Sequence, residues 1–433
     1  MFSQKNCRQR LEVWLFYGLA VAAASLATIA FGADPVADPV FARVRAGVLA
    51  DITDSRGIAC MESVERTRYL ARKVNRGSSC SDWIAAASNA PHGAVEWHER
   101  LRLDVTAAPE GEEFAPTGAS RFEAKDTAGI LRSASAGQGE FSTFLRNLFA
   151  GDGESFQSRG IQQTPLGKLL EFGFSVPAAK SHFVYSGPDG NAAATPSGYR
   201  GTIYALPDSS DLKRLTLEAD DAGEACRVQY AIDYRDTRIG EHTVILPQSS
   251  VMDVVYRDGR ELHSETYYSS CRRPVADPPV AMKAEPKPMP PGIRLRVRFQ
   301  VPIDGETAAS GDPIIGVVRT TVKDKQNGMI VHAGDRLHGR IVRIEQQLLP
   351  EPMWNVAIVF QTIERGVGDH GIDQGVEQPV SLVPLDDGDR EPHDEAMGPA
   401  ELQRLRPPGG AYFVFHGGSA VVDKSFETEW ETR

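Results

Sequence analysis

The chain has 433 residues, a formal net charge of −11 at pH 7 and a hydrophobic fraction of 41%. An acidic surface of this size repels nucleic acid and anionic lipid, which excludes the classes of protein that bind them through a basic face. The chain is also too long for one ordinary hydrophobic core, so we expect more than one domain.

The first residues have the order of a secretory signal. Lys5, Arg8 and Arg10 precede an apolar run at residues 13–31, and small residues follow in "AFGADP". This order predicts a signal peptide at residues 1–32 and an exported protein, located in the periplasm or outside the cell. The run approaches the length that spans a bilayer, so an uncleaved anchor stays open as the alternative. Only that alternative brings the protein into contact with a membrane.

The cysteines behind this segment are Cys60, Cys80, Cys226 and Cys271. An even number of cysteines in an exported chain predicts disulfides. We expect Cys60 to pair with Cys80, and Cys226 with Cys271, because each pair lies within one local region of the chain. Buried free thiols are the alternative. No Cys-x-x-Cys spacing occurs, which argues against a metal site built on these residues.

A proline-rich stretch divides the chain. "RRPVADPPVAMKAEPKPMPPG", residues 272–292, has no apolar period and predicts an extended linker. It separates a first domain at residues 33–271 from a second domain at residues 293–433. The second domain contains an acidic, proline-containing stretch at about residues 386–398, which predicts a solvated acidic loop.

The first domain opens with a helix pattern at residues 39–50 and then turns to strands. "LRLDVT" at residues 101–106 and "CRVQYAIDY" at residues 226–234 alternate between apolar and polar side chains. Such alternation is typical of an antiparallel sheet with one dry face and one wet face. We therefore expect a mainly β chain whose first domain is α+β, with a curved antiparallel sheet covered by helices.

One short segment differs from its strand-like surroundings. In "GEFSTFLRNLFAG", residues 139–151, the apolar side chains recur at the spacing of one helix face. This pattern predicts an amphipathic helix that covers the apolar face of the sheet. Aromatic residues further along the chain are candidates for the same interior. The predicted apolar lining is Phe141, Phe144, Leu145, Leu148, Phe149, Phe183, Tyr185 and Tyr204.

The second domain begins with "IRLRVRFQV" at residues 293–301, in which apolar side chains alternate with a row of arginines. Short strand patterns separated by turns continue to the C-terminus and predict a small all-β domain, either a β-barrel or a β-sandwich. The arginine row is interpreted as the wet side of an edge strand. The alternative is a site for an anionic headgroup, peptidoglycan or an acidic protein partner.

The order of several segments resembles a group of exported, two-domain bacterial proteins of unknown function that is frequent among Acidobacteria. The segments are "GQGEFSTFLRNLF", "YRGTIYALPDSSDLKRLTLEAD", "CRVQYAIDY", "GEHTVILPQSS", "VPID" and the terminal "W-x-T". This resemblance implies no activity. The first domain is also weakly similar, at the level of the fold, to the half-barrels of periplasmic lipoprotein carriers, which implies a curved sheet closed by helices over an apolar cavity.

No catalytic motif is found in the sequence. It lacks the "G-x-S-x-G" of a serine hydrolase and the "H-E-x-x-H" of a zinc protease, and "HGGS" at residues 416–419 is interpreted as a hairpin turn. The acidic loop lacks the spacing of a calcium-binding loop. We therefore expect a non-catalytic protein without a metal or cofactor.

The leading functional hypothesis is an exported protein that binds an apolar or lipid-like ligand beneath the helix in the first domain. The alternative is a scaffold or protein-interaction module of the cell envelope, with a protein partner and no small-molecule ligand. Neither hypothesis includes nucleic acid as a partner. A helix packed flush on the sheet favours the scaffold, whereas an open trough beneath it favours the ligand.

Overall fold

The computed structural model describes residues 39–72, 78–108, 111–118, 122, 139–151, 154–185, 196–274, 288–324, 329–366, 376–385, 409–417, 421–422 and 426–433. The predicted signal peptide, most of the predicted linker and the predicted acidic loop lie outside these residues. No helix within the described part of the chain is both long and apolar enough to span a membrane.

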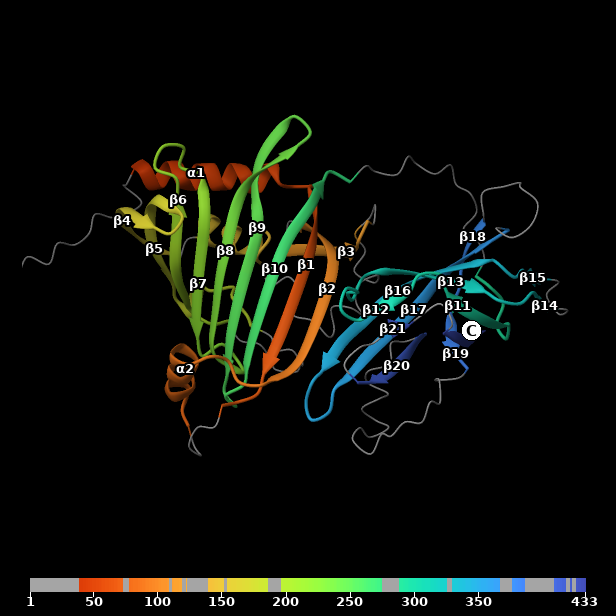
Figure 1. Cartoon of the computed structure of the whole chain (residues 1–433). Helices are drawn as coiled ribbons and strands as arrows, with labels where there is room; N and C mark the ends of the chain where they lie inside the picture. Colours follow the sequence, from red (N-terminus) through yellow and green to blue (C-terminus); the bar gives the residue numbers. More distant parts are fainter. Residues whose placement is uncertain are drawn as a thin grey trace, which may run out of the picture.

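A long antiparallel sheet forms the first half of the molecule (Figure 1). From β4 to β10, strands that follow one another in the chain are also neighbours in the sheet. Strand β10 then pairs with β1, the first strand in sequence. We call this sheet the half-barrel. In spatial order its strands are β4 (Ser155–Thr164), β5 (Gly167–Val176), β6 (Tyr199–Ala205), β7 (Leu212–Asp220), β8 (Ala225–Ile239), β9 (His242–Tyr256), β10 (Glu261–Arg272), β1 (Ala59–Tyr69), β2 (Val95–Ala108) and β3 (Gly111–Pro116).

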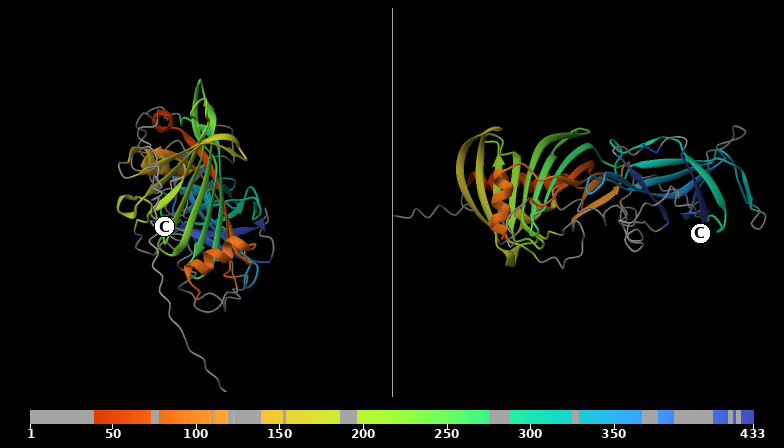
Figure 2. Two further views of the ribbon diagram at one scale, coloured as in Figure 1. Left: turned by 90° about the vertical axis from the view of Figure 1, so that its left-hand side faces the viewer. Right: turned by 60° about the horizontal axis from the view of Figure 1, so that its bottom comes forward.

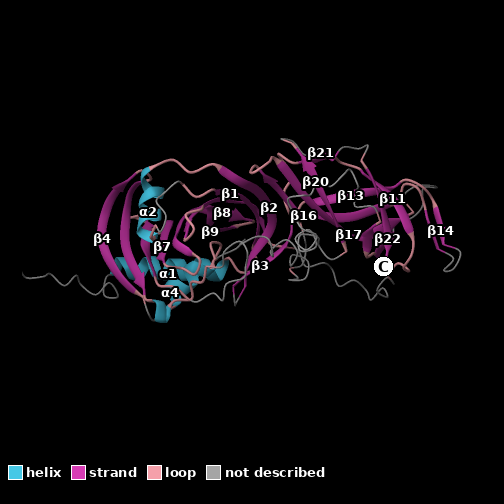
Figure 3. Cartoon of the chain, turned by 90° about the horizontal axis from the view of Figure 1, so that it is seen from below, coloured by secondary structure: helices cyan, strands magenta, loops and turns pink. Residues whose placement is uncertain are grey.

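Alternation along the strands decides which face is dry. In β8, Val228, Tyr230, Ile232 and Tyr234 are buried, and the residues between them are more exposed. The sheet arches around helices α1 (Pro39–Asp54) and α4 (Thr143–Ala150), which lie on its concave side (Figure 3). The prediction of a mainly β chain with a helix-covered antiparallel sheet is confirmed.

Helix α4 is shorter than the sequence predicts. It begins at Thr143, because the carboxylate of Glu112 on β3 accepts hydrogen bonds from the backbone N–H groups of Ser142 and Thr143, at 2.8 and 3.3 Å. An acidic group suits a helix N-terminus, where N–H groups lack intrahelical partners. Gly139 adopts a φ of +113°, which favours glycine, in the turn that leads into the helix. Phe141 therefore belongs to this turn and not to the helix.

Helix α2 (Cys80–Asn89) was not expected from the sequence. It begins with a capping box, in which the Ser79 side chain accepts from the backbone of Asp82 and the Asp82 side chain accepts from the backbone of Ser79. The serine and aspartate three residues apart were the available signal. Figure 2 shows α1 and α2 near opposite ends of the strands.

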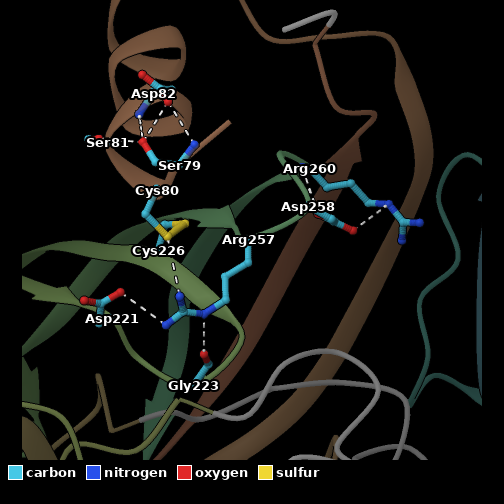
Figure 4. The surroundings of a disulfide bond; sticks show 10 residues. All are labelled: Ser79, Cys80, Ser81, Asp82, Asp221, Gly223, Cys226, Arg257, Asp258 and Arg260. Atoms are coloured by element: carbon cyan, nitrogen blue, oxygen red, sulfur yellow. Dashed lines mark hydrogen bonds and ion pairs between the residues drawn. A yellow bond between two sulfur atoms is a disulfide. The ribbon is translucent and has the colours of Figure 1, made fainter. Parts of the chain in front are cut away.

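The cysteines pair differently from the sequence prediction. The disulfides join Cys60 to Cys271 and Cys80 to Cys226. The predicted local pairs are wrong because β1 and β10 are neighbours in the sheet, which brings Cys60 beside Cys271 although they are 211 residues apart. The second bond ties α2 to β8 (Figure 4). Near it, the Arg257 guanidinium donates to the carbonyl oxygen of Gly223 at 3.0 Å and pairs with Asp221.

The second half of the molecule is a small barrel. Hydrogen-bonded pairs run from strand to strand in a ring, which closes because the bent segment from β18 to β19 pairs with β17 at one end and with β22 at the other. The structure thus favours the barrel over the sandwich. Its strands in ring order are β11 (Arg294–Phe299), β13 (Pro313–Val318), β16 (Arg336–Gln347), β17 (Met353–Arg365), β18 (Val376–Pro379), β19 (Leu382–Pro384) and β22 (Glu427–Thr432).

Three smaller features complete the barrel. Strand β20 (Gly410–His416) pairs with β17, while β12 (Ile303–Asp304) pairs with β21 (Val421–Val422) and β14 (Val322–Asp324) with β15 (Met329–Val331).

The indole of Trp430 is fully buried in the barrel core and donates to the hydroxyl of Thr428 at 2.7 Å.

The arginine row of β11 does not lie on an edge strand. Strand β11 lies between β13 and β22, and β22 presents a matching row of glutamates. Arg294 pairs with Glu431 at 3.0 Å and Arg296 with Glu429 at 2.9 Å. These pairs are exposed and add little stability, but they neutralise the cationic face that the sequence suggested as a binding site for anions.

The half-barrel and the barrel share backbone hydrogen bonds. Residues 97–99 of β2 pair with residues 345–347 of β16. Arg102 donates to the Asp312 carboxylate at 2.6 Å, and a buried apolar cluster forms across the junction. The cluster contains Val64, Leu101 and Leu103 from the half-barrel and Val342, Ala357 and Tyr412 from the barrel. Burial of these groups joins the two sheets into one body (Figure 2).

Candidate functional site

The concave face of the half-barrel holds the residues that the sequence assigns to a ligand site. The apolar stripe of α4 consists of Phe144, Leu145, Leu148 and Phe149, whose exposed fractions are 7% or less. Phe144 packs edge-on against Tyr230 of β8, with ring centroids 5.2 Å apart. Each such side chain contributes about 1.5–3 kcal/mol through burial. The stripe therefore faces inward, as the sequence predicts.

The other predicted lining residues occupy different places. Phe183 and Tyr185 lie on the concave face in the same core as α4. Phe141 joins a separate apolar cluster, where its ring lies 5.7 Å from that of Tyr268. Tyr204 does not line the interior. Its neighbours Ile203 and Ala205 are fully buried on the inner side of β6, so strand alternation turns Tyr204 to the outer face.

A small crevice borders α4 in the described part of the chain. The crevice at its inner end has a volume of about 10 Å³, close to the minimum for a single water molecule. Its lining comes from both helices and from the sheet: Val48, Asp51, Ile52, Ser55, Phe141, Ser142, Leu145, Leu212, Tyr234, Ile245, Leu246 and Pro247. At this crevice the helix packs closely against the sheet.

One acidic group borders this crevice. Asp51, in the last turn of α1, accepts a hydrogen bond from the backbone N–H of Ile245 at 3.4 Å. Burial raises the pKa of Asp51 to about 6, and the nearby charges of Asp211, Asp54 and Asp236 act in the same direction. The folded protein therefore holds this proton more tightly than the unfolded chain does.

This pKa has a consequence for stability. Because the folded-state pKa lies above the unfolded value of 3.8, the stabilising contribution is complete at low pH and is lost as the pH rises from about 4 to about 6. We expect Asp51→Asn to raise the free energy of unfolding at pH 7 by about 1–2 kcal/mol, after allowance for the partial exposure of the group, and to leave it unchanged at pH 3.5. Urea denaturation at both pH values measures this. The exposed Asp208, replaced by asparagine, is the matched control, and an equal gain at both pH values would contradict the prediction.

A buried polar strip lies beside the apolar half of the concave face. We define it as Glu62, Arg66, Glu99, Ser264 and Thr266, which point inward from β1, β2 and β10 and are each at most 5% exposed. The Arg66 side chain is 1% exposed, and its Nε lies 3.1 Å from Oε1 of Glu99. Neither Nη1 nor Nη2 of Arg66 has a hydrogen-bond partner. A buried guanidinium needs partners for these donors.

The electrostatics of the polar strip favour neutral carboxyl groups. Burial raises the pKa of Glu62 well above its usual range, and the charges of Glu140 and Glu112 raise it further, while Arg66 opposes them. Burial also raises the pKa of Glu99, again opposed by Arg66. A protonated Glu62 donates a hydrogen bond instead of only accepting one.

Buried tyrosines lie on the same concave face as this strip. The register aligns Tyr230 with Met252, Met252 with Ser264 and Ser264 with Arg66, so Tyr230 and Arg66 lie on the same face of the sheet. Tyr185 and Tyr256 share a hydrogen bond of 2.6 Å, whereas the Tyr230 hydroxyl is buried without a partner. Arg66, Glu62 and Tyr230 are therefore buried polar side chains on the same face of the sheet as the apolar core.

Sequence reasoning missed the polar strip. Hydrophobic periodicity detects a strand by its apolar side chains, and β1 turns Glu62 and Arg66 to the inside with only Val64 between them. The one signal for the polar strip in the sequence was the alternation in "ESVERTR", residues 62–68. Within the described residues, no group of three or more histidine, cysteine, aspartate or glutamate side chains is arranged to hold a metal ion.

The sequence matches no protein-family model and no curated protein. Two solved structures are similar in part. A DUF1329 family protein from Desulfovibrio piger is 12% identical, covers 57% of this chain and 98% of its own, and has a TM-score of 0.29. An outer membrane lipoprotein-sorting protein domain from Vibrio parahaemolyticus is 8% identical, covers 53% of this chain and 92% of its own, and has a TM-score of 0.26. These scores are too low to carry an argument about this chain, and neither structure supports the resemblance to the acidobacterial group.

Proposed function

We propose that the protein is an exported, non-catalytic binding protein whose half-barrel takes one lipid-like ligand on its concave face. The observation that carries the proposal is the Arg66 guanidinium, which is 1% exposed and has two nitrogens without hydrogen-bond partners. Next to it lies the apolar core beneath α4. An interior with one buried polar end and a long apolar end suits an amphiphile better than it suits a purely structural core.

Binding requires α4 to move. The crevice beneath the helix holds about 10 Å³, so an acyl chain enters only when the stripe of α4 leaves the sheet. The helix has 8 residues, and the Glu112 carboxylate holds its N-terminus. Arg45 donates to the carbonyl oxygen of Phe149 at 2.9 Å, and Arg146 donates to that of Ala108 at 2.6 Å. Opening exposes the buried stripe of α4, so the acyl chain of the ligand must replace the apolar contacts that the stripe loses.

The experiment uses a fluorescent fatty acid as the probe, together with native mass spectrometry of protein extracted gently from the cell envelope. We expect saturable binding of one probe per chain and a co-purifying lipid mass. In Arg66→Met/Glu99→Gln both members of the buried contact are replaced, so neither is left without its partner, the fold is retained and probe affinity falls at least tenfold. Arg294→Met, on the exposed barrel surface, is the matched control. Ligand-free preparations that bind no probe would overturn the proposal.

A scaffold of the cell envelope is the second candidate, and two observations favour it. The apolar stripe of α4 is packed flush, and hydrogen bonds between β2 and β16 join the half-barrel and the barrel into one body. Amide hydrogen exchange separates the two functions. A carrier requires the α4 amides to exchange much faster than those of β8, whereas a scaffold protects both equally.

A further inference from the structure

The terminal nitrogens of Arg66 distinguish it from the other arginines of the described residues. It is the one arginine there whose Nη1 and Nη2 are both buried and without a hydrogen-bond partner. Its Nε alone lies near an acidic group, 3.1 Å from Glu99. By contrast, Arg68 on the same strand pairs with Glu96 at 2.9 Å and is 17% exposed. The N–H donors on both terminal nitrogens of Arg66 therefore lack an acceptor within the described part of the chain.

Short polar side chains lie beside Arg66 on the concave face. Ser264 of β10 is directly opposite it, Thr266 is the next inward residue of that strand, and Ser250 of β9 lies opposite Thr266. All three are at most 4% exposed. A hydroxyl can both donate and accept a hydrogen bond. The surroundings of Arg66 therefore suit a compact polar group better than an apolar one.

The carboxyl groups near Arg66 are weak counter-charges. Burial raises the pKa of Glu99, and it raises the pKa of Glu62 well above its usual range. The ion pair next to Glu99, between Arg343 and Glu345 at 2.7 Å, is balanced in itself. A guanidinium in a dry interior is stabilised by an anion that accepts its hydrogen bonds.

We propose that the concave face selects amphiphiles whose polar end is an oxyanion, either a carboxylate or a phosphate, bound by the terminal nitrogens of Arg66. This inference rests on the proposed function and names the class of its ligand. The planar fork of a guanidinium donates two parallel hydrogen bonds to two oxygens of such a group, which a hydroxyl or an ammonium cannot accept. Because the chain has a net charge of −11, the attraction is local to the interior and does not extend to anionic membrane surfaces.

One row of the sheet leads from Arg66 to the apolar core. The register passes from Arg66 over Ser264 and Met252 to Tyr230, on the adjacent strands β1, β10, β9 and β8 (Figure 1). Three strand spacings of about 4.8 Å place Tyr230 roughly 14 Å from Arg66 along the sheet. There the Tyr230 ring packs against Phe144 of α4, with centroids 5.2 Å apart. An oxyanion on Arg66 therefore leaves the acyl chain on the side of α4.

The test uses the full chain and amphiphiles that share a dodecyl chain and differ in the polar end. Dodecanoate and dodecyl phosphate are the oxyanions, dodecanol is the uncharged compound and dodecylamine is the cation. Each is titrated against the uncharged dye phenylnaphthylamine, so that the reporter itself has no oxyanion. We expect at least one oxyanion to bind about tenfold more tightly than dodecanol and dodecylamine. The tighter of the two oxyanions identifies the source as a fatty acid or a phospholipid headgroup.

Variants of Arg66 separate its role from general apolar binding. In Arg66→Met/Glu99→Gln the oxyanions should fall to the affinity of dodecanol, which itself should not change. Arg68→Met/Glu96→Gln removes the neighbouring ion pair and is the matched control, in which the preference for oxyanions should remain. Arg66→Lys keeps the charge and loses the planar fork, so oxyanion affinity should fall about threefold or more. This variant decides the outcome if the double variant does not fold.

Two results would overturn this inference while the proposed function stands. One is dodecanol or dodecylamine binding as tightly as both oxyanions. The other is a preference for oxyanions that persists in Arg66→Met/Glu99→Gln or, if that variant does not fold, an oxyanion affinity that Arg66→Lys leaves unchanged. If no amphiphile displaces the dye and no fatty acid binds, the proposed function falls together with this inference.

Discussion

Replacing Cys60 and Cys271 together by alanine is expected to lower the free energy of unfolding of the half-barrel by about 5 kcal/mol. The bond closes a loop of 211 residues and joins the first and last long strands of the sheet, β1 and β10. Without it, the unfolded chain gains the freedom of that loop, while the folded sheet keeps its register. Denaturation in urea, followed by near-ultraviolet circular dichroism, measures the difference.

Peptide mapping under non-reducing conditions is the companion measurement. We expect one cross-linked fragment that contains Cys60 and Cys271, and another that contains Cys80 and Cys226. The bond between Cys80 and Cys226 closes a loop of 146 residues, so replacing both by alanine is a control with a similar expected loss of stability. A fragment that joins Cys60 to Cys80 would contradict the strand order of the half-barrel.

Phe149→Ala is expected to destabilise the half-barrel by about 3–5 kcal/mol. The Phe149 side chain is fully buried, and its ring centroid lies 6.3 Å from that of Phe41 on α1 and 6.2 Å from that of Phe156 on β4. Truncation removes apolar contacts among two helices and the sheet and leaves a cavity. Thermal and urea unfolding report the loss of stability.

Ile161→Ala is the matched control, because Ile161 is an apolar residue on β4 of the half-barrel and is 58% exposed. Its truncation should change the free energy of unfolding by less than about 0.5 kcal/mol. Equal effects of the two substitutions would show that the α4 stripe does not pack against the sheet. The cavity in Phe149→Ala should also bind more of the fatty-acid probe if α4 is the cover of a ligand site.

Part of the candidate site could be read from local pattern. The helical spacing of Phe144, Leu145 and Leu148 marks one buried face, and the only place for that face in a strand-rich domain is the dry side of a sheet. Alternation in residues 226–234 likewise predicts which side chains of β8 point inward. Both patterns depend on neighbours a few residues apart, so they need no knowledge of the partner strands.

Tyr204 shows where such reasoning fails. Its aromatic ring predicts a place in the interior, yet Tyr204 directly follows the buried Ile203 and so lies on the opposite face of β6. The sequence prediction also missed the polar strip, for the converse reason. Glu62 and Arg66 are polar side chains on an inner face, which hydrophobic periodicity reads as exposed.

The sequence by itself determined the strand-rich class, the inward stripe of α4 and the presence of enough cysteines for two bonds, because each follows from composition or short-range spacing. Only the tertiary structure decided the pairing of those cysteines, the closure of the barrel by a bent segment and the junction of β2 with β16. These features join residues that are far apart in the chain. Their partners are selected by strand order and register over the whole sheet, which no local pattern encodes.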